Sequence, residues 1–356
     1  MEKQIEMSGM LEMVPQPAFL VDQNTIVLVN QAARQLTLEV GTPVASMLFE
    51  DAQEYSAFDG GCLCLTLSVA GCPMSAAVTR MNTLDLFVID PIPEPAELKA
   101  MALTAIEFRE PLSDIMTIKE HIIDAVAPDR KDATDPWVAQ MNRRINQMHR
   151  TLCNMADAAQ YAAEARPKMA CQNVCAVLDE VFERSCTLVE KAGYHLNYSG
   201  LSQNITCLIA ADRLERCIYN ILSNAMKNSP VGSTIDATLT RRGKKLYLSI
   251  QDYGNGVPPH LLSSLYSRYR RHPGLEDPDT GLGLGMVLVR NTATIHGGTV
   301  LIDQPQGRGT RITISLSIRT SGGETVRTGI LPVDYAGEYD HALLELSDVL
   351  PLEFYL

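Results

Sequence analysis

Three polar residues recur at helical spacing near the middle of the chain, and they open a series of four motifs that constrains the fold more than any other feature. Asn220, Asn224 and Lys227 lie four and three residues apart, so they share one face of an expected helix over residues 213–227. An amide oxygen at Asn224 can coordinate Mg²⁺, a hard cation that takes oxygen ligands together with phosphates. A lysine one turn later can contact the same phosphate, so this face predicts a metal–phosphate site.

The second motif places a carboxylate at the end of an expected strand. Asp252 is followed by tyrosine, Gly254, asparagine and Gly256. A carboxylate at that position can accept a hydrogen bond from an adenine amino group, and glycines, which lack a Cβ, let the backbone approach the ring closely. The motif therefore predicts an adenine site.

The third and fourth motifs are glycine-rich turns. Gly281, Gly283 and Gly285 alternate with leucine and open an expected helix, where unpaired backbone amides can cradle phosphate. Gly309 and Thr310 form a tight turn before the last expected strand. Each motif alone would suit many loops, but the four together in this order predict one nucleotide site.

In this order the motifs resemble the N, G1, G2 and G3 boxes of the histidine-kinase-type ATPase superfamily, which includes gyrases, chaperones of the heat-shock 90 class and MutL proteins. The resemblance implies a Bergerat-type α/β sandwich over residues 172–319, with ATP and Mg²⁺ as cofactors and Asn224 as the metal ligand. Residues 265–271 fall at the F box of the kinases and residues 272–280 at a short ATP lid. The implied cofactor-binding residues are Asn220, Asn224, Lys227, Asp252, Gly254, Gly256, Gly281, Gly283, Gly285, Gly309 and Thr310.

Position 220 separates the kinases from the ATP-hydrolysing members of the superfamily. The hydrolysing members carry a glutamate there as general base, whereas this chain carries Asn220. An amide cannot take a proton from water at neutral pH, so vigorous hydrolysis is disfavoured. This residue favours a histidine kinase over a gyrase-like ATPase.

Two long helical runs precede this domain and predict an antiparallel two-helix hairpin over residues 96–166. Apolar residues recur at spacings of three and four in both runs. Asp135 and Pro136 suit the start of the second helix, as a cap and a first-turn proline. Each apolar stripe covers one face only, so two helices cannot close a good core alone. A homodimer through the hairpin would complete a four-helix bundle.

The hairpin resembles the dimerisation and histidine-phosphotransfer domain of sensor histidine kinases, except at the phosphoacceptor. The usual signature is His-Glu-Leu-Arg-Thr-Pro-Leu, and this chain has Ile-Glu-Phe-Arg-Glu-Pro-Leu from Ile106 to Leu112. Ile106 occupies the phosphoacceptor position and has no nucleophile, so phosphorylation at that position is chemically excluded. Glu107 is retained beside it, and Glu110 replaces the Thr or Asn that is tied to phosphatase action. The catalytic residue is therefore left unassigned.

Residues 1–91 predict a smaller unit with two strands, short helices and three further strands. Ala18–Asp22 is expected as the first of these strands and Leu84–Ile89 as the last. The order resembles a PAS-like α/β sensor, although a small α+β domain without a ligand explains the same pattern. The whole chain is thus predicted to be α+β and multidomain: a PAS-like sensor (1–91), the hairpin (96–166), the ATP-binding domain (172–319), and a hinge with an apolar C-terminal tail (320–356).

Composition and charge limit the kinds of partner that this chain is expected to bind. The formal net charge of −12 argues against nucleic acid, because phosphate binding needs a basic face. No charge-free apolar run approaches the length of a membrane span, and no apolar stretch follows the charged residues 1–9. The nine cysteines lack zinc-site spacing and are expected to be reduced thiols. We expect a cytoplasmic protein whose tail, with a helix from Tyr339 to Val349, packs on its own chain.

Three functions fit these residues. The first is an ATP-binding signal-transduction protein of the sensor histidine kinase type that is a degenerate pseudokinase. It would act through nucleotide-dependent dimer conformation on a response regulator or another kinase. The second is an active protein kinase that phosphorylates a partner or an unusual residue, such as His149 or His121. His121 lies about 22 Å along the first helix from position 106. The third is a binding module with a vestigial ATP site, which the intact Asn224, Lys227 and Asp252 argue against.

Overall fold

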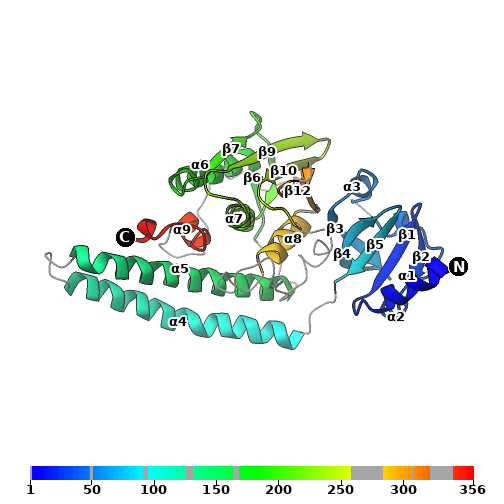
Figure 1. The fold of residues 1–356 in the computed structure, drawn as a ribbon, viewed down its shortest axis with the longest axis horizontal. Coiled ribbons are helices and arrows are strands. Elements are labelled where there is room, and N and C mark those ends of the chain that lie inside the picture. Colours follow the sequence, from blue (N-terminus) through cyan, green and yellow to red (C-terminus); the bar gives the residue numbers. More distant parts are fainter. Residues whose placement is uncertain are drawn as a thin grey trace.

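The computed structural model describes residues 2–48, 51–90, 95–125, 131–162, 168–257, 284–305, 308–320 and 340–356. Within these residues the helices and strands combine as an α+β, multidomain protein (Figure 1). Figure 1 shows the N-terminal elements at one end, a long helical hairpin along the bottom, and the remaining helices and strands above the hairpin.

The N-terminal residues form five antiparallel strands in the order β2-β1-β5-β4-β3. The predicted strands at Ala18–Asp22 and Leu84–Ile89 are confirmed, and Phe19 stacks on Phe87 between them with ring centroids 4.8 Å apart. The elements are α1 (Glu2–Glu12), β1 (Ala18–Asp22), β2 (Thr25–Val29), α2 (Gln31–Gln35), the short 3-10 helix η1 (Val44–Ser46), α3 (Ala52–Ser56), β3 (Cys62–Val69), β4 (Cys72–Met81) and β5 (Leu84–Ile89).

The helical hairpin consists of α4 (Pro95–Ala125) and α5 (Lys131–Ala162), which run side by side (Figure 1). Leu112 and Met116 of α4 pack against Ile145 of α5. The predicted start of the second helix at Asp135–Pro136 is wrong, because α5 begins at Lys131 and includes Pro136. A proline close to a helix start removes one backbone hydrogen bond there and does not prevent the preceding residues from being helical.

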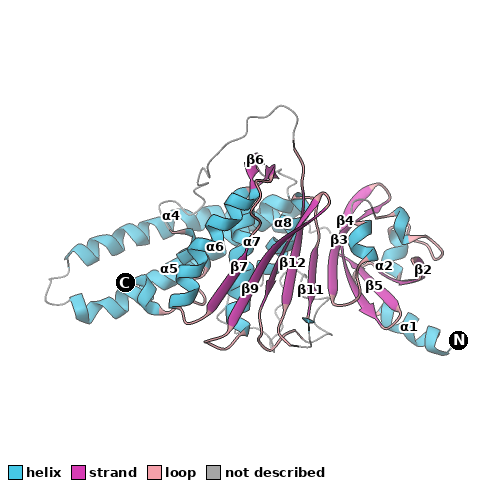
Figure 2. Cartoon of the chain, turned by 90° about the horizontal axis from the view of Figure 1, so that it is seen from above, coloured by secondary structure: helices cyan, strands magenta, loops and turns pink. Residues whose placement is uncertain are grey.

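The following residues form a mixed sheet that helices cover on one face. Residues of β10 alternate between buried and half-buried positions, and those of β12 do so from Arg311 to Ile314, which is the pattern of a sheet with one packed face. α6, α7 and α8 supply the other half of that core (Figure 2). The elements are β6 (Ala170–Asn173), α6 (Val174–Lys191), β7 (His195–Ser199), β8 (Thr206–Ile209), α7 (Ala211–Asn228), β9 (Thr234–Arg242), β10 (Lys245–Gln251), α8 (Gly285–Ile295), β11 (Val300–Asp303) and β12 (Arg311–Ser317).

Two strands of this part were not expected from the sequence. β7 pairs in parallel with β9 at the end of the sheet, and β6 pairs with β8 in a separate two-stranded sheet. β8 therefore lies outside the large sheet.

The five N-terminal strands continue directly into the large sheet of the following unit. β3 pairs antiparallel with β11, with Leu63 opposite Leu301, so that ten strands form a single sheet (Figure 2). Gly61 makes the junction possible, because a Cβ at that position would lie 2.2 Å from the backbone oxygen of Ile302. Beside the junction, the Lys245 ammonium lies 2.5 Å from the Glu54 carboxylate. Hydrogen bonds and ion pairs thus join the N-terminal unit directly to the sheet of the larger one.

The C-terminal residues pack on their own chain. α9 (His341–Glu345) and the 3-10 helix η5 (Leu352–Tyr355) lie between α5 and the α6–α7 pair (Figure 1). Leu344, Leu346 and Leu350 are fully buried there. The helix expected from Tyr339 to Val349 is shorter than predicted, and Tyr339 lies outside the described residues. The predicted self-packing of the tail is confirmed for residues 340–356.

In the described part of the chain, we find no helix whose length and apolar character would let it cross a membrane.

Candidate functional site

One face of α7 carries the three residues of the first motif. Asn220 is buried; its amide nitrogen donates to the Arg216 backbone oxygen (2.9 Å) and its side-chain oxygen accepts from Arg150 of α5 (3.1 Å). Asn224 donates through its amide nitrogen to the sulfur of Met286 (3.3 Å), which leaves the amide oxygen on the opposite side of the group. The polar stripe of α7 therefore faces the start of α8, and at Asn220 it also contacts α5.

Asp252 follows β10 directly and is 5% exposed. Its Oδ1 accepts from the backbone amides of Gly254 (2.9 Å) and Thr310 (3.2 Å). Burial raises the pKa of Asp252, and these hydrogen bonds offset part of that rise. The carboxylate is therefore held rigidly between two turns, in a surrounding that disfavours its charge.

The glycines of the second and fourth motifs let three backbone segments touch. A Cβ at Gly254 would lie 1.9 Å from the Asn228 backbone oxygen, at the end of α7. A Cβ at Gly309, whose φ is +66°, would lie 2.0 Å from the Asp252 backbone oxygen. A Cβ at Gly256 would lie 2.9 Å from the Gly309 backbone oxygen. These positions require glycine because neighbouring backbone occupies the volume of any side chain.

The third motif is described only at its end. Gly285 is the first residue of α8, and a Cβ there would lie 3.0 Å from the Asn220 side-chain oxygen. Gly281 and Gly283 lie outside the described residues, as do the segments expected as F box and lid. The structure thus brings α7, the turn after β10, the turn before β12 and the start of α8 into one contiguous region.

Lys227 lies in this region with an unexpected partner. Its ammonium is 2.9 Å from Oδ2 of Asp348 in the C-terminal segment, and the same oxygen accepts from Arg150 at 2.5 Å. Glu345, which is fully buried, pairs with Arg216 at 2.7 Å. No sequence motif pointed to Arg150, Arg216, Glu345 or Asp348. Their contacts join segments about 120 to 200 residues apart, and each residue alone is an ordinary charged position.

Ile106, which the sequence predicts to occupy the phosphoacceptor position, lies on α4, and the adjacent Glu107 is exposed. A second apolar stripe on α4 faces away from α5. Leu103, Phe108, Ile115, Ile118 and Ile122 are each between 45% and 56% exposed. These residues have no covering element among those that the structure describes.

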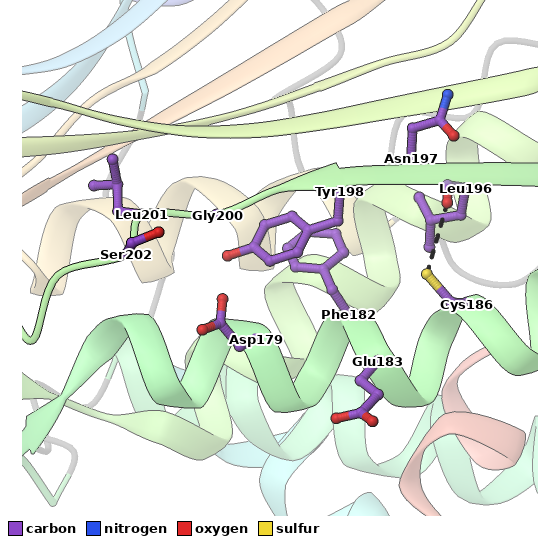
Figure 3. A pocket seen from close by; sticks show the side chains of 10 residues that line it. All are labelled: Asp179, Phe182, Glu183, Cys186, Leu196, Asn197, Tyr198, Gly200, Leu201 and Ser202. Carbon is purple, nitrogen blue, oxygen red and sulfur yellow. Dashed lines mark hydrogen bonds between the residues drawn. The ribbon is translucent and has the colours of Figure 1, made fainter.

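A separate cavity of about 640 Å³ lies between α6 and β7 (Figure 3). Phe182 and Tyr198 stack in its wall with ring centroids 4.1 Å apart. Burial and the neighbouring Asp179 carboxylate raise the pKa of Tyr198. The lining contains no residue of the four motifs, so this cavity is not part of the candidate nucleotide site.

Metal clusters and disulfides are not features of the described chain. No group of three or more His, Cys, Asp or Glu side chains gathers there at metal-binding geometry. None of the nine cysteines, all of which lie in the described residues, forms a disulfide.

Comparisons with known proteins point to one family. The family described as "Histidine kinase-, DNA gyrase B-, and HSP90-like ATPase" matches residues 209–320. Sensor histidine kinase CusS of Escherichia coli (strain K12) is 24% identical over 268 residues, covering 68% of this chain and 55% of CusS. Histidine protein kinase DivJ of Caulobacter vibrioides is 34% identical over 112 residues, which is 31% of this chain and 19% of DivJ.

Among solved structures, full-length ShkA in complex with AMPPNP superposes with a TM-score of 0.51 at 19% identity, covering 63% of this chain and 46% of ShkA. That likeness establishes the fold alone. The chain spans little more than half the length of CusS and a smaller share of DivJ.

Proposed function

We propose that this chain, which is similar to sensor histidine kinases and matches their ATPase family over residues 209–320, binds Mg-ATP and acts as a pseudokinase, passing nucleotide occupancy to a partner through the conformation of a dimer. The partner would be a response regulator or another kinase. In this proposal residues 1–91 sense a signal, residues 96–166 form the dimer, residues 172–319 bind ATP, and residues 320–356 form a hinge and a docking tail.

One observation carries the ATP site. Asp252, held by two backbone amides, lies in one contiguous region with the polar face of α7 and the start of α8. A fixed carboxylate suits the adenine amino group, while Lys227 and the α8 amides suit phosphates. Bound Mg²⁺ would neutralise phosphate charge, with Asn224 as its protein ligand.

The pseudokinase assignment rests on Ile106. Its hydrocarbon side chain cannot accept a phosphoryl group at the position where the family's signature has histidine. Mg-ATP at about 100 times its dissociation constant is expected to add nearly 3 kcal/mol to the free energy of unfolding. Incubation of the same protein with Mg²⁺ and γ-labelled ATP is expected to leave no label on the chain after denaturing electrophoresis.

Two histidine variants complete this test. Ile106→His is expected to acquire label, whereas Thr117→His, on the polar side of the same helix, is expected to stay unlabelled. Label on the unmodified protein would identify an active kinase with another acceptor, such as His121 or His149. Absence of any stabilisation by Mg-ATP would refute nucleotide binding itself.

We further propose that the exposed apolar stripe on α4 is the dimer interface. Soluble proteins rarely leave five large apolar side chains in a row on one helix face, and a second hairpin would cover them in a four-helix bundle. Ile118→Glu is expected to weaken the dimer by at least about 100-fold, because a charge would enter the bundle core. Light scattering over a range of concentrations measures the mass. Thr117→Glu, on the polar side of α4, is the matched control, and a dimer that survives Ile118→Glu would place the interface elsewhere.

A further inference from the structure

The C-terminal segment places a carboxylate on the lysine that the proposed function assigns to phosphate. Oδ2 of Asp348 lies 2.9 Å from the Lys227 ammonium and 2.5 Å from the Arg150 guanidinium. Burial alone would raise the pKa of Asp348, but the charges of Arg150 and Lys227 outweigh it and lower that pKa. Asp348 is therefore an anion at neutral pH, and it forms ion pairs with two cations at the edge of the candidate nucleotide site.

Asp348 is held in this place by the rest of the segment. Glu345 is fully buried and bridges Arg216 of α7 (2.7 Å) and Arg150 of α5 (3.3 Å). The backbone oxygen of Ser347 accepts from Arg143 at 3.1 Å. Together with the buried leucines of the segment, these contacts hold the carboxylate in position and reduce the entropy lost when it pairs with the two cations.

The segment also ties two parts of the protein together (Figure 1). Arg143 and Arg150 belong to α5 of the hairpin, whereas Arg216 and Lys227 belong to α7, which carries the candidate site. Asp348 and Glu345 each contact both helices. The C-terminal residues therefore bridge the nucleotide-binding part and the hairpin through Glu345 and through Asp348, which also neutralises Lys227.

We propose that residues 340–356 act as an internal competitor of ATP: Asp348 and the nucleotide phosphates exclude each other from Lys227, so that ATP binding releases the segment and loosens the contact between α7 and α5. This inference rests on the proposed function, because it takes Lys227 to be a phosphate ligand. Coupling between two binding events is reciprocal, so a docked segment weakens ATP binding by the same factor by which ATP weakens docking.

The first test is the dissociation constant for Mg-AMPPNP, measured by titration calorimetry on the full chain and two variants. Asp348→Asn is expected to bind about tenfold more tightly than the unmodified chain, because Lys227 loses its competing anion. Glu353→Gln removes an exposed carboxylate from the same segment and is expected to change nothing. Equal or weaker binding by Asp348→Asn overturns the competition, and weaker binding would make Asp348 a support for Lys227.

A second measurement needs no substitution. Hydrogen exchange of backbone amides in residues 340–356 is expected to accelerate by about tenfold when Mg-AMPPNP saturates the unmodified chain, and exchange that stays the same or slows overturns the proposal. Failure of the proposed function has a different signature, since no heat of binding would then appear in any of the three proteins. That outcome would overturn the competition together with the ATP site.

Discussion

Replacement of Asp252 by asparagine is expected to lower the affinity for ATP by about 100-fold while leaving the protein at least as stable as before. Asparagine keeps one acceptor oxygen for the amides of Gly254 and Thr310, which now share Oδ1 of Asp252. Its other terminal group is an NH₂ donor, which would face the amino donor of adenine. A lost charge-assisted hydrogen bond with an unpaired donor left in its place costs about 3 kcal/mol, which corresponds to roughly 100-fold in affinity.

The stability half of this prediction follows from the pKa of Asp252. Burial raises that pKa, so the folded state binds the proton more tightly than the unfolded state does. The resulting stabilisation is complete below the ordinary pKa of aspartate and is lost as the pH rises through the raised value. At neutral pH the buried charge therefore lowers the free energy of unfolding, and a neutral asparagine removes that penalty.

Titration calorimetry with Mg-AMPPNP and urea unfolding at pH 7 measure the two halves separately. Asp236→Asn is the matched control, since it neutralises a carboxylate on the neighbouring strand that pairs with Tyr253 instead. The control is expected to bind nucleotide like the unmodified protein. If Asp252→Asn unfolded more easily and bound ATP normally, Asp252 would be a structural residue and the adenine site would lie elsewhere.

Local patterns in the sequence predicted the elements that depend on near neighbours. Ala18–Asp22 and Leu84–Ile89 are strands as expected, because apolar and β-branched residues there are bounded by turn residues. The face of α7 that unites Asn220, Asn224 and Lys227 followed from helical periodicity alone. Whether these side chains bind ATP stays a prediction, since their positions alone do not test it.

Contacts between distant segments could not be predicted in the same way. The pairing of β3 with β11 joins residues more than 200 positions apart, and no turn sets its register. β7 was missed because His195–Ser199 has just one fully buried side chain, Leu196, in a polar segment. α1 was not predicted because it has few apolar residues. It is held in place by the packing of Leu11 on Ala18 and Leu20 of β1, a contact that the sequence of the helix itself does not indicate.

The acidic residues of the tail illustrate the same limit at the site. Glu345 and Asp348 lie in an apolar stretch whose leucines predicted that the tail packs on its own chain. No neighbouring residue in the sequence indicates which cations the two carboxylates pair with. Their partners Arg150 and Arg216 lie on α5 and α7, which are far from the tail in the sequence. Burial of ionised groups is tolerated here because each has an opposite charge within hydrogen-bonding distance.

Replacement of Gly309 by alanine is expected to cost at least about 3 kcal/mol of unfolding free energy and to abolish ATP binding. Its Cβ would lie 2.0 Å from the Asp252 backbone oxygen, so the two turns must separate. Separation breaks the backbone hydrogen bonds from Asp252 to Thr310 (2.9 Å) and from Gly309 to Gly254 (3.1 Å). It also withdraws the Thr310 amide from the Asp252 carboxylate, which loses its fixed orientation toward adenine.

Gly243→Ala is the control that separates this clash from backbone strain. Gly243 has a φ of +59°, close to the +66° of Gly309, but nothing lies within 4 Å of the Cβ that alanine would add. Its substitution should therefore cost about 1 kcal/mol, the ordinary penalty for a side chain in the left-handed region, and leave nucleotide affinity intact. Urea unfolding and calorimetry on both variants decide the matter. Equal free energies of unfolding for the two variants would mean that the turn before β12 rearranges at no energetic cost. Normal ATP binding by Gly309→Ala would show that this turn is not part of the nucleotide site.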